Sequence, residues 1–112
     1  MVSAVVYLGI DVGGTGIKAA IVDERGNILR HAETPTGASE GAARVLERIR
    51  RLGRGLIEQA GAQVVACGVG APGRIDHRRG HVIFGSGNLP GWTGVDLRAE
   101  LHRAFGLPVL VD

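Results

Sequence analysis

The sequence has 112 residues, 45% of them apolar and 21% charged, which are ordinary proportions for a single globular domain. A formal net charge of +2 gives no argument for a nucleic-acid partner, and a single cysteine, Cys67, excludes an internal disulfide and fits a reducing compartment. The apolar N-terminal run has no Lys or Arg before it and is interrupted by Asp11. These features favour neither a signal peptide nor a membrane span, so we expect a cytoplasmic protein.

The first third of the chain predicts three strands joined by short turns. Residues 4–12 and 16–23 are rich in β-branched and other apolar side chains, and residues 28–33 alternate as a strand does. Because the connections between them are short, antiparallel neighbours are the simplest arrangement.

A long helix is expected from about residue 40 to residue 60. Its apolar residues recur at spacings of three and four and share one face: Val45, Leu46, Ile49, Leu52, Leu56, Ile57 and Ala60. Ser39 is the expected N-cap, and Gly53 and Gly55 each weaken the helix by about 1 kcal/mol relative to alanine. Residues 63–71 follow as a buried strand, and a strand reached through a helix pairs in parallel with the opening sheet.

The last third predicts shorter elements. Residues 72–80 are expected to form a loop, residues 81–84 a short strand, and residues 85–94 a loop too rich in glycine for regular structure. A helix over residues 96–105 and a final strand over residues 108–112 complete the order.

The segment "DVGGTGIK" leaves two interpretations open. Successive backbone N–H groups in a glycine turn can converge on an anion, and Thr15 and Lys18 would add a hydroxyl and a cation. Asp11 could hold Mg²⁺, directly or through water, because this ion prefers oxygen ligands. Alternatively, the segment is a tight hairpin whose glycines only supply positive φ angles. The local chemistry does not decide between them.

Four motifs taken together decide between these two interpretations, in favour of the anion-binding loop. In chain order, "GIDVGGTGIKAAIVD", "GVGAPGRID", "GNLPGWTGVDLRAEL" and "FGLPVLVD" resemble the N-terminal half of the ROK family of repressors, open reading frames and sugar kinases. The resemblance runs from about Tyr7 to Asp112. Other sugar kinases and actin-like ATPases share the first type of loop, whereas the four motifs together are specific.

The resemblance implies an α/β fold: an actin-like ATPase (ribonuclease H-like) lobe, with a mixed sheet, antiparallel opening strands and helices packed on it. It implies one domain over residues 1–112, the N-terminal part of a glucokinase-like sugar kinase. Such an enzyme transfers the γ-phosphate of ATP, with Mg²⁺, to a hydroxyl of a hexose or N-acetylhexosamine. Polyphosphate remains open as the donor, no nucleic-acid or membrane partner is expected, and the full-length protein is expected to be a homo-oligomer.

The resemblance also implies which residues bind. The phosphate loop comprises Asp11, Gly13, Gly14, Thr15 and Lys18, with Asp11 the expected metal ligand. The sugar site is shaped by Gly73 and Asn88, with Arg74 and Ser86 as further candidates. The Asn88 amide can donate to and accept from sugar hydroxyls. Without the family pattern, its segment would be interpreted as a surface loop pinned by Trp92.

The chain departs from the family pattern at its end. The family's catalytic base is the aspartate of an Asn-Asp pair that follows the strand "PVLVD", and Asp112 matches the acidic position before that pair. The family's zinc cluster and second lobe belong to the later part of the sequence and are absent here. We therefore expect the 112-residue chain alone not to catalyse.

Two other function classes stay open. One is a sugar-responsive regulator of the same family, which would need a DNA-binding domain before Asp11, where only ten residues stand. The other is a non-catalytic module that binds phosphate or sugar. Several residues have simpler interpretations: the arginines of residues 44–54 as a solvated helix face, His77 and His81 as loop residues without a third ligand, and Cys67 as a small buried side chain.

Overall fold

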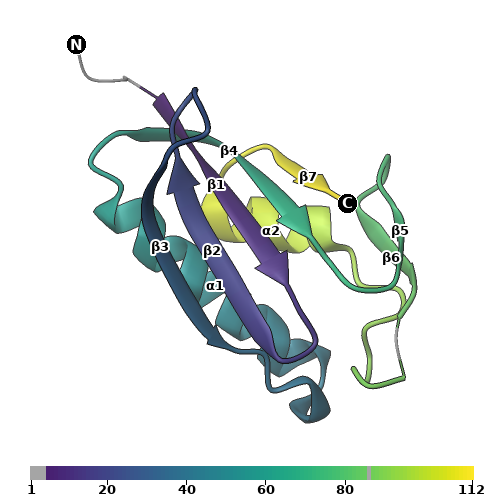
Figure 1. Ribbon diagram of the computed structural model, residues 1–112. Helices are drawn as coiled ribbons and strands as arrows, with labels where there is room; N and C mark the ends of the chain where they lie inside the picture. The colour runs from purple at the N-terminus through teal and green to yellow at the C-terminus, as the bar shows by residue number, and fades with distance from the viewer. Residues whose placement is uncertain (1–4, 86) are drawn as a thin grey trace.

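A computed structural model describes residues 5–85 and 87–112, and Figure 1 shows their path. The elements in chain order are β1 (Val5–Val12), β2 (Gly16–Val22), β3 (Ile28–Pro35), the 3₁₀ turn η1 (Ala38–Glu40), α1 (Ala42–Gln59), β4 (Gln63–Gly70), β5 (Arg74–Asp76), β6 (His81–Phe84), α2 (Leu97–Phe105) and β7 (Val109–Val111). Neither helix in this part of the chain is long and apolar enough to cross a membrane.

Five strands form one mixed sheet in the order β3-β2-β1-β4-β7. The opening strands pair antiparallel, with Leu8 opposite Ile21 in β1–β2, and β1 pairs in parallel with β4 on its other side. β7 extends the sheet in parallel beside β4. The antiparallel opening and the parallel return through a helix are therefore confirmed.

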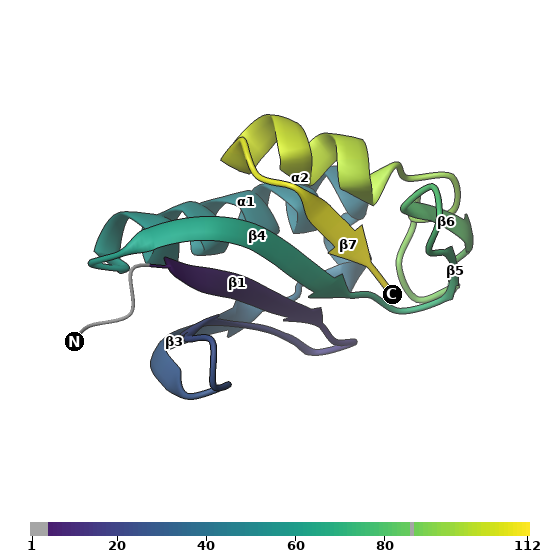
Figure 2. The same ribbon diagram turned by 90° about the horizontal axis from the view of Figure 1, so that it is seen from above.

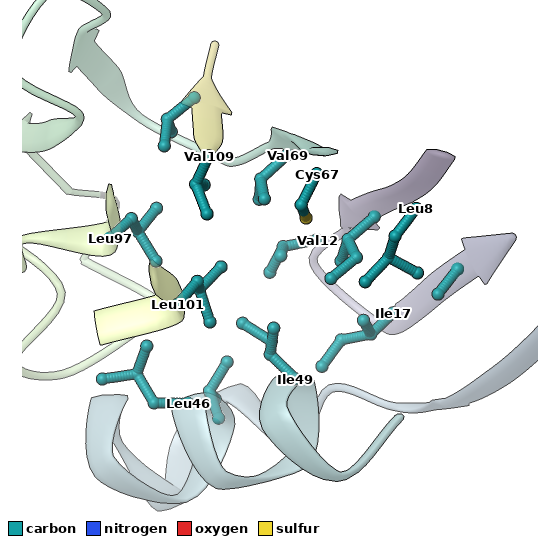
Figure 3. Packing of buried hydrophobic residues seen from close by; sticks show 14 of the residues in the cluster. Leu8, Val12, Ile17, Leu46, Ile49, Cys67, Val69, Leu97, Leu101 and Val109 are labelled. Carbon is teal, nitrogen blue, oxygen red and sulfur yellow. The ribbon is translucent and has the colours of Figure 1, made fainter. Parts of the chain in front are cut away.

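Both helices cover the same face of this sheet, as Figure 2 shows. Alternate residues of β1 point into the space between sheet and helices, so Val6, Leu8, Ile10 and Val12 are buried while Tyr7 and Asp11 are exposed on the other face. In Figure 3 apolar side chains from α1 and α2 converge on those of β1, β2, β4 and β7. The molecule therefore has one core, on one side of the sheet.

The expected N-cap of the long helix is wrong. Ser39 lies inside η1, and α1 begins after Gly41, which offers no side chain to cap it. The first helical N–H, of Ala42, instead donates to the carbonyl of Pro90 at 2.8 Å. A tertiary contact thus satisfies one of the four N-terminal N–H groups that have no partner inside a helix.

The expected loop over residues 72–80 is wrong in part, because it contains β5. This strand pairs antiparallel with β6 in a separate hairpin. In the turn, Oδ1 of Asp76 accepts hydrogen bonds from the N–H groups of Arg78 and Arg79. Three residues are too few to show a period in the sequence, so only the turn chemistry was visible there.

The two glycines of α1 differ in the space that surrounds them. A Cβ at Gly53 would lie 2.7 Å from Cε1 of Phe105, so the missing side chain lets the aromatic ring of α2 pack against α1. A Cβ at Gly55 would meet nothing within 4 Å. Gly53 is therefore a packing requirement, whereas Gly55 only weakens the helix.

We predict opposite effects of two alanine substitutions. Gly55→Ala should raise the free energy of unfolding by about 0.5–1 kcal/mol, because it removes the glycine penalty in a helix interior. Gly53→Ala should lower it by about 1–2 kcal/mol, because the Phe105 ring must move. Urea unfolding followed by circular dichroism measures both, and Gly53→Ala with Phe105→Leu should recover part of the loss. Equal effects at the two positions would refute this packing account.

Candidate functional site

The loops that follow the parallel strands gather at one edge of the sheet. β1, β4 and β7 run in the same direction, so the β1–β2 loop, the β4–β5 loop and Asp112 lie at the same end (Figure 1). The N–H of Ala71 donates to the Asp112 carbonyl at 2.9 Å, which ties the ends of β4 and β7 together. In open α/β sheets, ligands bind at the carboxyl ends of the strands.

Hydrogen bonds within the loop and from Thr36 fix the conformation of the β1–β2 loop. The N–H of Gly13 donates to the Gly16 carbonyl at 2.9 Å and closes the turn. The hydroxyl of Thr36, which lies just after β3, donates to the Gly13 carbonyl at 2.8 Å, and the Thr36 N–H donates to the Thr15 carbonyl at 3.0 Å. The sequence pattern gave no indication of a role for Thr36.

The glycines of this loop do not supply positive φ angles. The glycines with positive φ do not include Gly13 or Gly14, so that reason for the hairpin interpretation is wrong. A Cβ at Gly13 would lie 2.8 Å from the Gly16 carbonyl oxygen, so the closed turn requires glycine there. A Cβ at Gly14 would meet nothing within 4 Å. The chain's own packing therefore gives no reason for the missing side chain at Gly14.

Asp11 and Lys18 share the open face of the sheet. They lie directly across from each other in β1 and β2, and Glu33 of β3 lies across from Lys18 on the other side. All three line a hollow of about 590 Å³ along this face, together with Gly9 and Gly68. The hollow meets the loop region at Asp11 but is not lined by residues 13–15.

The two loops expected to shape a sugar site are joined by Trp92. Its ring is fully buried, and its Nε1–H donates to the Pro72 carbonyl at 3.0 Å. A Cβ at Gly73, whose φ is 100°, would lie 2.5 Å from the Phe84 carbonyl oxygen. The β5–β6 hairpin therefore requires a glycine at position 73 for its own closure. The side chain that could have revealed this junction in the sequence is the single tryptophan.

The remaining sugar-site candidates lie on the surface. Arg74 at the start of β5 and Asn88 in the following loop are both exposed. Ser86 lies outside the described residues. The loop that carries Asn88 is also attached to the rest of the lobe at Pro90, through its hydrogen bond from the start of α1.

Other titratable residues have structural partners. Arg44, Arg48, Arg50 and Arg51 form ion pairs with glutamates, and Arg54 donates to the Ala104 carbonyl. His81 Nε2 lies 2.9 Å from Asp96 Oδ2. Among residues 5–85 and 87–112, no three His, Cys, Asp or Glu side chains are grouped to hold a metal ion. Burial raises the pKa of the Cys67 thiol to about 12, which leaves it protonated and unreactive at neutral pH.

A mixed sheet of this order, with both helices on one face and its loops gathered at the carboxyl ends of the strands, defines an actin-like ATPase lobe. The model of the ROK family matches residues 7–112. The chain belongs to the ROK family.

Known relatives are similar over nearly the whole of this chain. It is 35% identical over 105 residues to a glucokinase of Streptomyces coelicolor, an alignment that covers 94% of this chain and 31% of that protein. The chain therefore spans about a third of the length of that enzyme.

Solved structures are similar over the same span. A ROK family glucokinase of Streptomyces griseus in complex with glucose and AMPPNP is 34% identical with a TM-score of 0.83, over 96% of this chain and 32% of that one. An inorganic polyphosphate/ATP-glucomannokinase of an Arthrobacter strain is 33% identical with a TM-score of 0.80, over 96% of this chain and 43% of that one. The actin-like ATPase fold expected from the sequence is confirmed.

We predict that the two loop glycines differ in their effect on stability. Gly13→Ala should lower the free energy of unfolding by about 1–3 kcal/mol, because the new Cβ contacts a backbone oxygen that cannot move freely. Gly14→Ala should change it by less than about 0.5 kcal/mol. Thermal and urea unfolding of the two variants make the comparison, and a loss at Gly14 as large as that at Gly13 would contradict the observed open space.

We also predict that Cys67 is inert in the folded chain. At pH 8 a thiol with a pKa near 12 has about 1000-fold less thiolate than one with a pKa near 9, so labelling by a thiol reagent should follow unfolding rather than the folded state. Labelling rates measured across a urea series should rise with the unfolded fraction. Rapid labelling of the native chain without urea would contradict the burial.

Proposed function

We propose that this chain is the N-terminal domain, residues 1–112, of an ATP-dependent, glucokinase-like sugar kinase. The whole protein would transfer the γ-phosphate of ATP to a hydroxyl of a hexose. Membership of the ROK family and the two kinase structures support this activity. The observation that carries the proposal is the open backbone at Gly14, in the loop that follows Asp11 at the carboxyl end of β1.

In this proposal the β1–β2 loop receives phosphate. Gly13, Gly14 and Thr15 would offer backbone N–H groups, and Thr15 a hydroxyl on an exposed residue. Lys18 would contribute a positive charge from the open face, on the same side of the sheet as Asp11. A substrate that approaches Gly14 meets no side chain of the loop, which favours close contact with the backbone.

Asp11 fits the demands of Mg²⁺. It is exposed at the end of β1, and its Oδ1 would lie 3.6 Å from a Cβ built on Gly70, so the glycine leaves room beside the carboxylate. Mg²⁺ is commonly bound by one or two carboxylates, with phosphate oxygens and water as the other ligands. Asp11 would hold the metal in this way, and the metal would neutralise charge on the transferred phosphate.

The sugar would lie against the loops joined by Trp92. Gly73, Arg74 and Asn88, together with Ser86, would face its hydroxyls with backbone groups, a guanidinium, an amide and a hydroxyl. A hexose or N-acetylhexosamine would fit such donors and acceptors. We expect no turnover by the 112-residue chain alone, because the catalytic base and the second lobe would come from the remainder of a protein three times as long. That whole protein is expected to form homo-oligomers.

A hybrid enzyme tests the proposal. Residues 7–112 would replace the aligned segment of the Streptomyces coelicolor glucokinase, and phosphorylation of glucose, mannose and N-acetylglucosamine would be measured with ATP or polyphosphate as donor. We expect sugar phosphorylation with ATP and Mg²⁺, and a loss of at least about 100-fold in kcat/KM for Asp11→Asn, because metal-dependent charge neutralisation is removed.

The matched control is Asp23→Asn, which alters a half-buried aspartate hydrogen-bonded to Asn27 in the β2–β3 turn. The Asn27 hydrogen bonds hold the pKa of Asp23 below its ordinary value, so this carboxylate is charged at the pH of the assay. Asp23→Asn should leave kcat/KM within about twofold. A folded hybrid that phosphorylates no sugar with either donor would refute the kinase proposal, and equal activities of the two variants would refute the role of Asp11.

A further inference from the structure

Thr36 is unusual among the residues that the structure describes. It is 1% exposed and is the only one of them that is both polar and fully buried. A buried hydroxyl is retained without loss of stability only where its hydrogen bond is made. The partner of this hydroxyl is the carbonyl of Gly13, in a loop 23 residues earlier in the sequence.

Two hydrogen bonds from Thr36 fix two peptide groups of the β1–β2 loop. Its hydroxyl donates to the Gly13 carbonyl at 2.8 Å, and its N–H donates to the Thr15 carbonyl at 3.0 Å. These carbonyls belong to the peptides before Gly14 and before Gly16. Each is therefore held facing Thr36, one on either side of the open position at Gly14.

Peptide planarity extends this effect to the opposite side of the loop. Every described peptide is trans, so the N–H of each unit points opposite to its C=O. Since the Gly13 and Thr15 carbonyls face Thr36, the N–H groups of Gly14 and Gly16 point away from it. Gly14 is exposed, so a loop held in this way presents the Gly14 N–H outward without reorganisation when an anion arrives.

Thr36 is itself anchored to α1. Its carbonyl accepts a hydrogen bond from Nη1 of Arg48 at 3.1 Å, and Nη2 of the same guanidinium lies 2.6 Å from Oε2 of Glu40. The next residue, Gly37, makes room for this pair, because a Cβ there would lie 2.6 Å from Arg48 Nη1. A continuous set of contacts thus runs from α1 through Thr36 to the loop.

We infer that Thr36 is a positioning residue for the phosphate loop, with Arg48 as its anchor on α1. Thr36 touches no substrate; it holds the Gly13 and Thr15 carbonyls so that the loop, with the exposed Gly14 N–H, faces the phosphates of the bound nucleotide. The role in nucleotide binding rests on the proposed kinase function. The fixing of the loop does not, and it can be measured in this chain alone.

The first experiment uses the 112-residue chain. Thr36→Val keeps the shape of the side chain and removes the hydroxyl, Thr36→Ser keeps the hydroxyl, and Thr34→Val is the matched control on a half-buried threonine of β3. Amide hydrogen exchange is followed by NMR. We expect Thr36→Val to speed exchange of the Gly13 and Thr36 N–H groups at least tenfold relative to amides of β1 and β4, whereas Thr36→Ser and Thr34→Val leave them unchanged.

The second experiment uses the hybrid glucokinase. Thr36→Val should raise the KM for Mg·ATP about tenfold and change the KM for glucose less than twofold, and Thr36→Ser should restore the parent value. A general loss of structure would move both constants together. If the unaltered hybrid phosphorylates no sugar, the kinase proposal fails, and the exchange comparison alone decides the positioning of the loop.

A milder pair of variants keeps the inference testable if Thr36→Val does not fold. Arg48→Gln removes the anchor of the Thr36 carbonyl, and Arg51→Gln removes a neighbouring arginine that pairs with Glu47 on the exposed side of α1. We expect Arg48→Gln to speed loop exchange about threefold and Arg51→Gln to leave it unchanged. Loop exchange that is equal in the parent, Thr36→Val and Arg48→Gln would overturn the inference.

Discussion

The one-sided core is the constraint from which the rest of the lobe follows. Because side chains alternate along a strand, burying Val6, Leu8, Ile10 and Val12 against the helices turns the residues between them to the other face. Asp11 is exposed on that face for this reason, and Lys18 lies opposite it through the β1–β2 register. A slip of one residue would exchange the two sets, so the stability of the core also determines where these charges lie.

Much of the fold could be predicted from periodicity. The strands around residues 4–35, the long helix and the parallel return of β4 each have a pattern several residues long, and the structure places them within a few residues of the expected bounds. Two expectations, Ser39 as the N-cap and a loop in place of β5, were wrong because periodicity could not inform them. The start of α1 depends on a carbonyl far along the chain, at Pro90, and β5 is too short to show a period.

The candidate site was predictable in composition but not in geometry. The glycines, Asp11 and Lys18 stand together in one motif, whereas their binding roles remain predictions that the proposed variants test. Thr36 carried no signal of its role, and the single tryptophan indicated a pinned loop without indicating its partner, because each acts through a hydrogen bond to a backbone carbonyl in a distant loop. Such a contact needs the right side chain at one end only, and any residue can supply the carbonyl at the other.

The hollow on the open face has a consequence for engineering this chain. Gly9 and Gly68 line it, and a Cβ at either would meet nothing within 4 Å. Glycine in a strand interior is unfavourable, so selection for stability alone would replace both with larger residues. The replacements would fill the space beside Asp11 and Lys18. Directed evolution that selects only for thermal stability would thus stabilise the fold of this lobe and at the same time fill the hollow next to its charged residues.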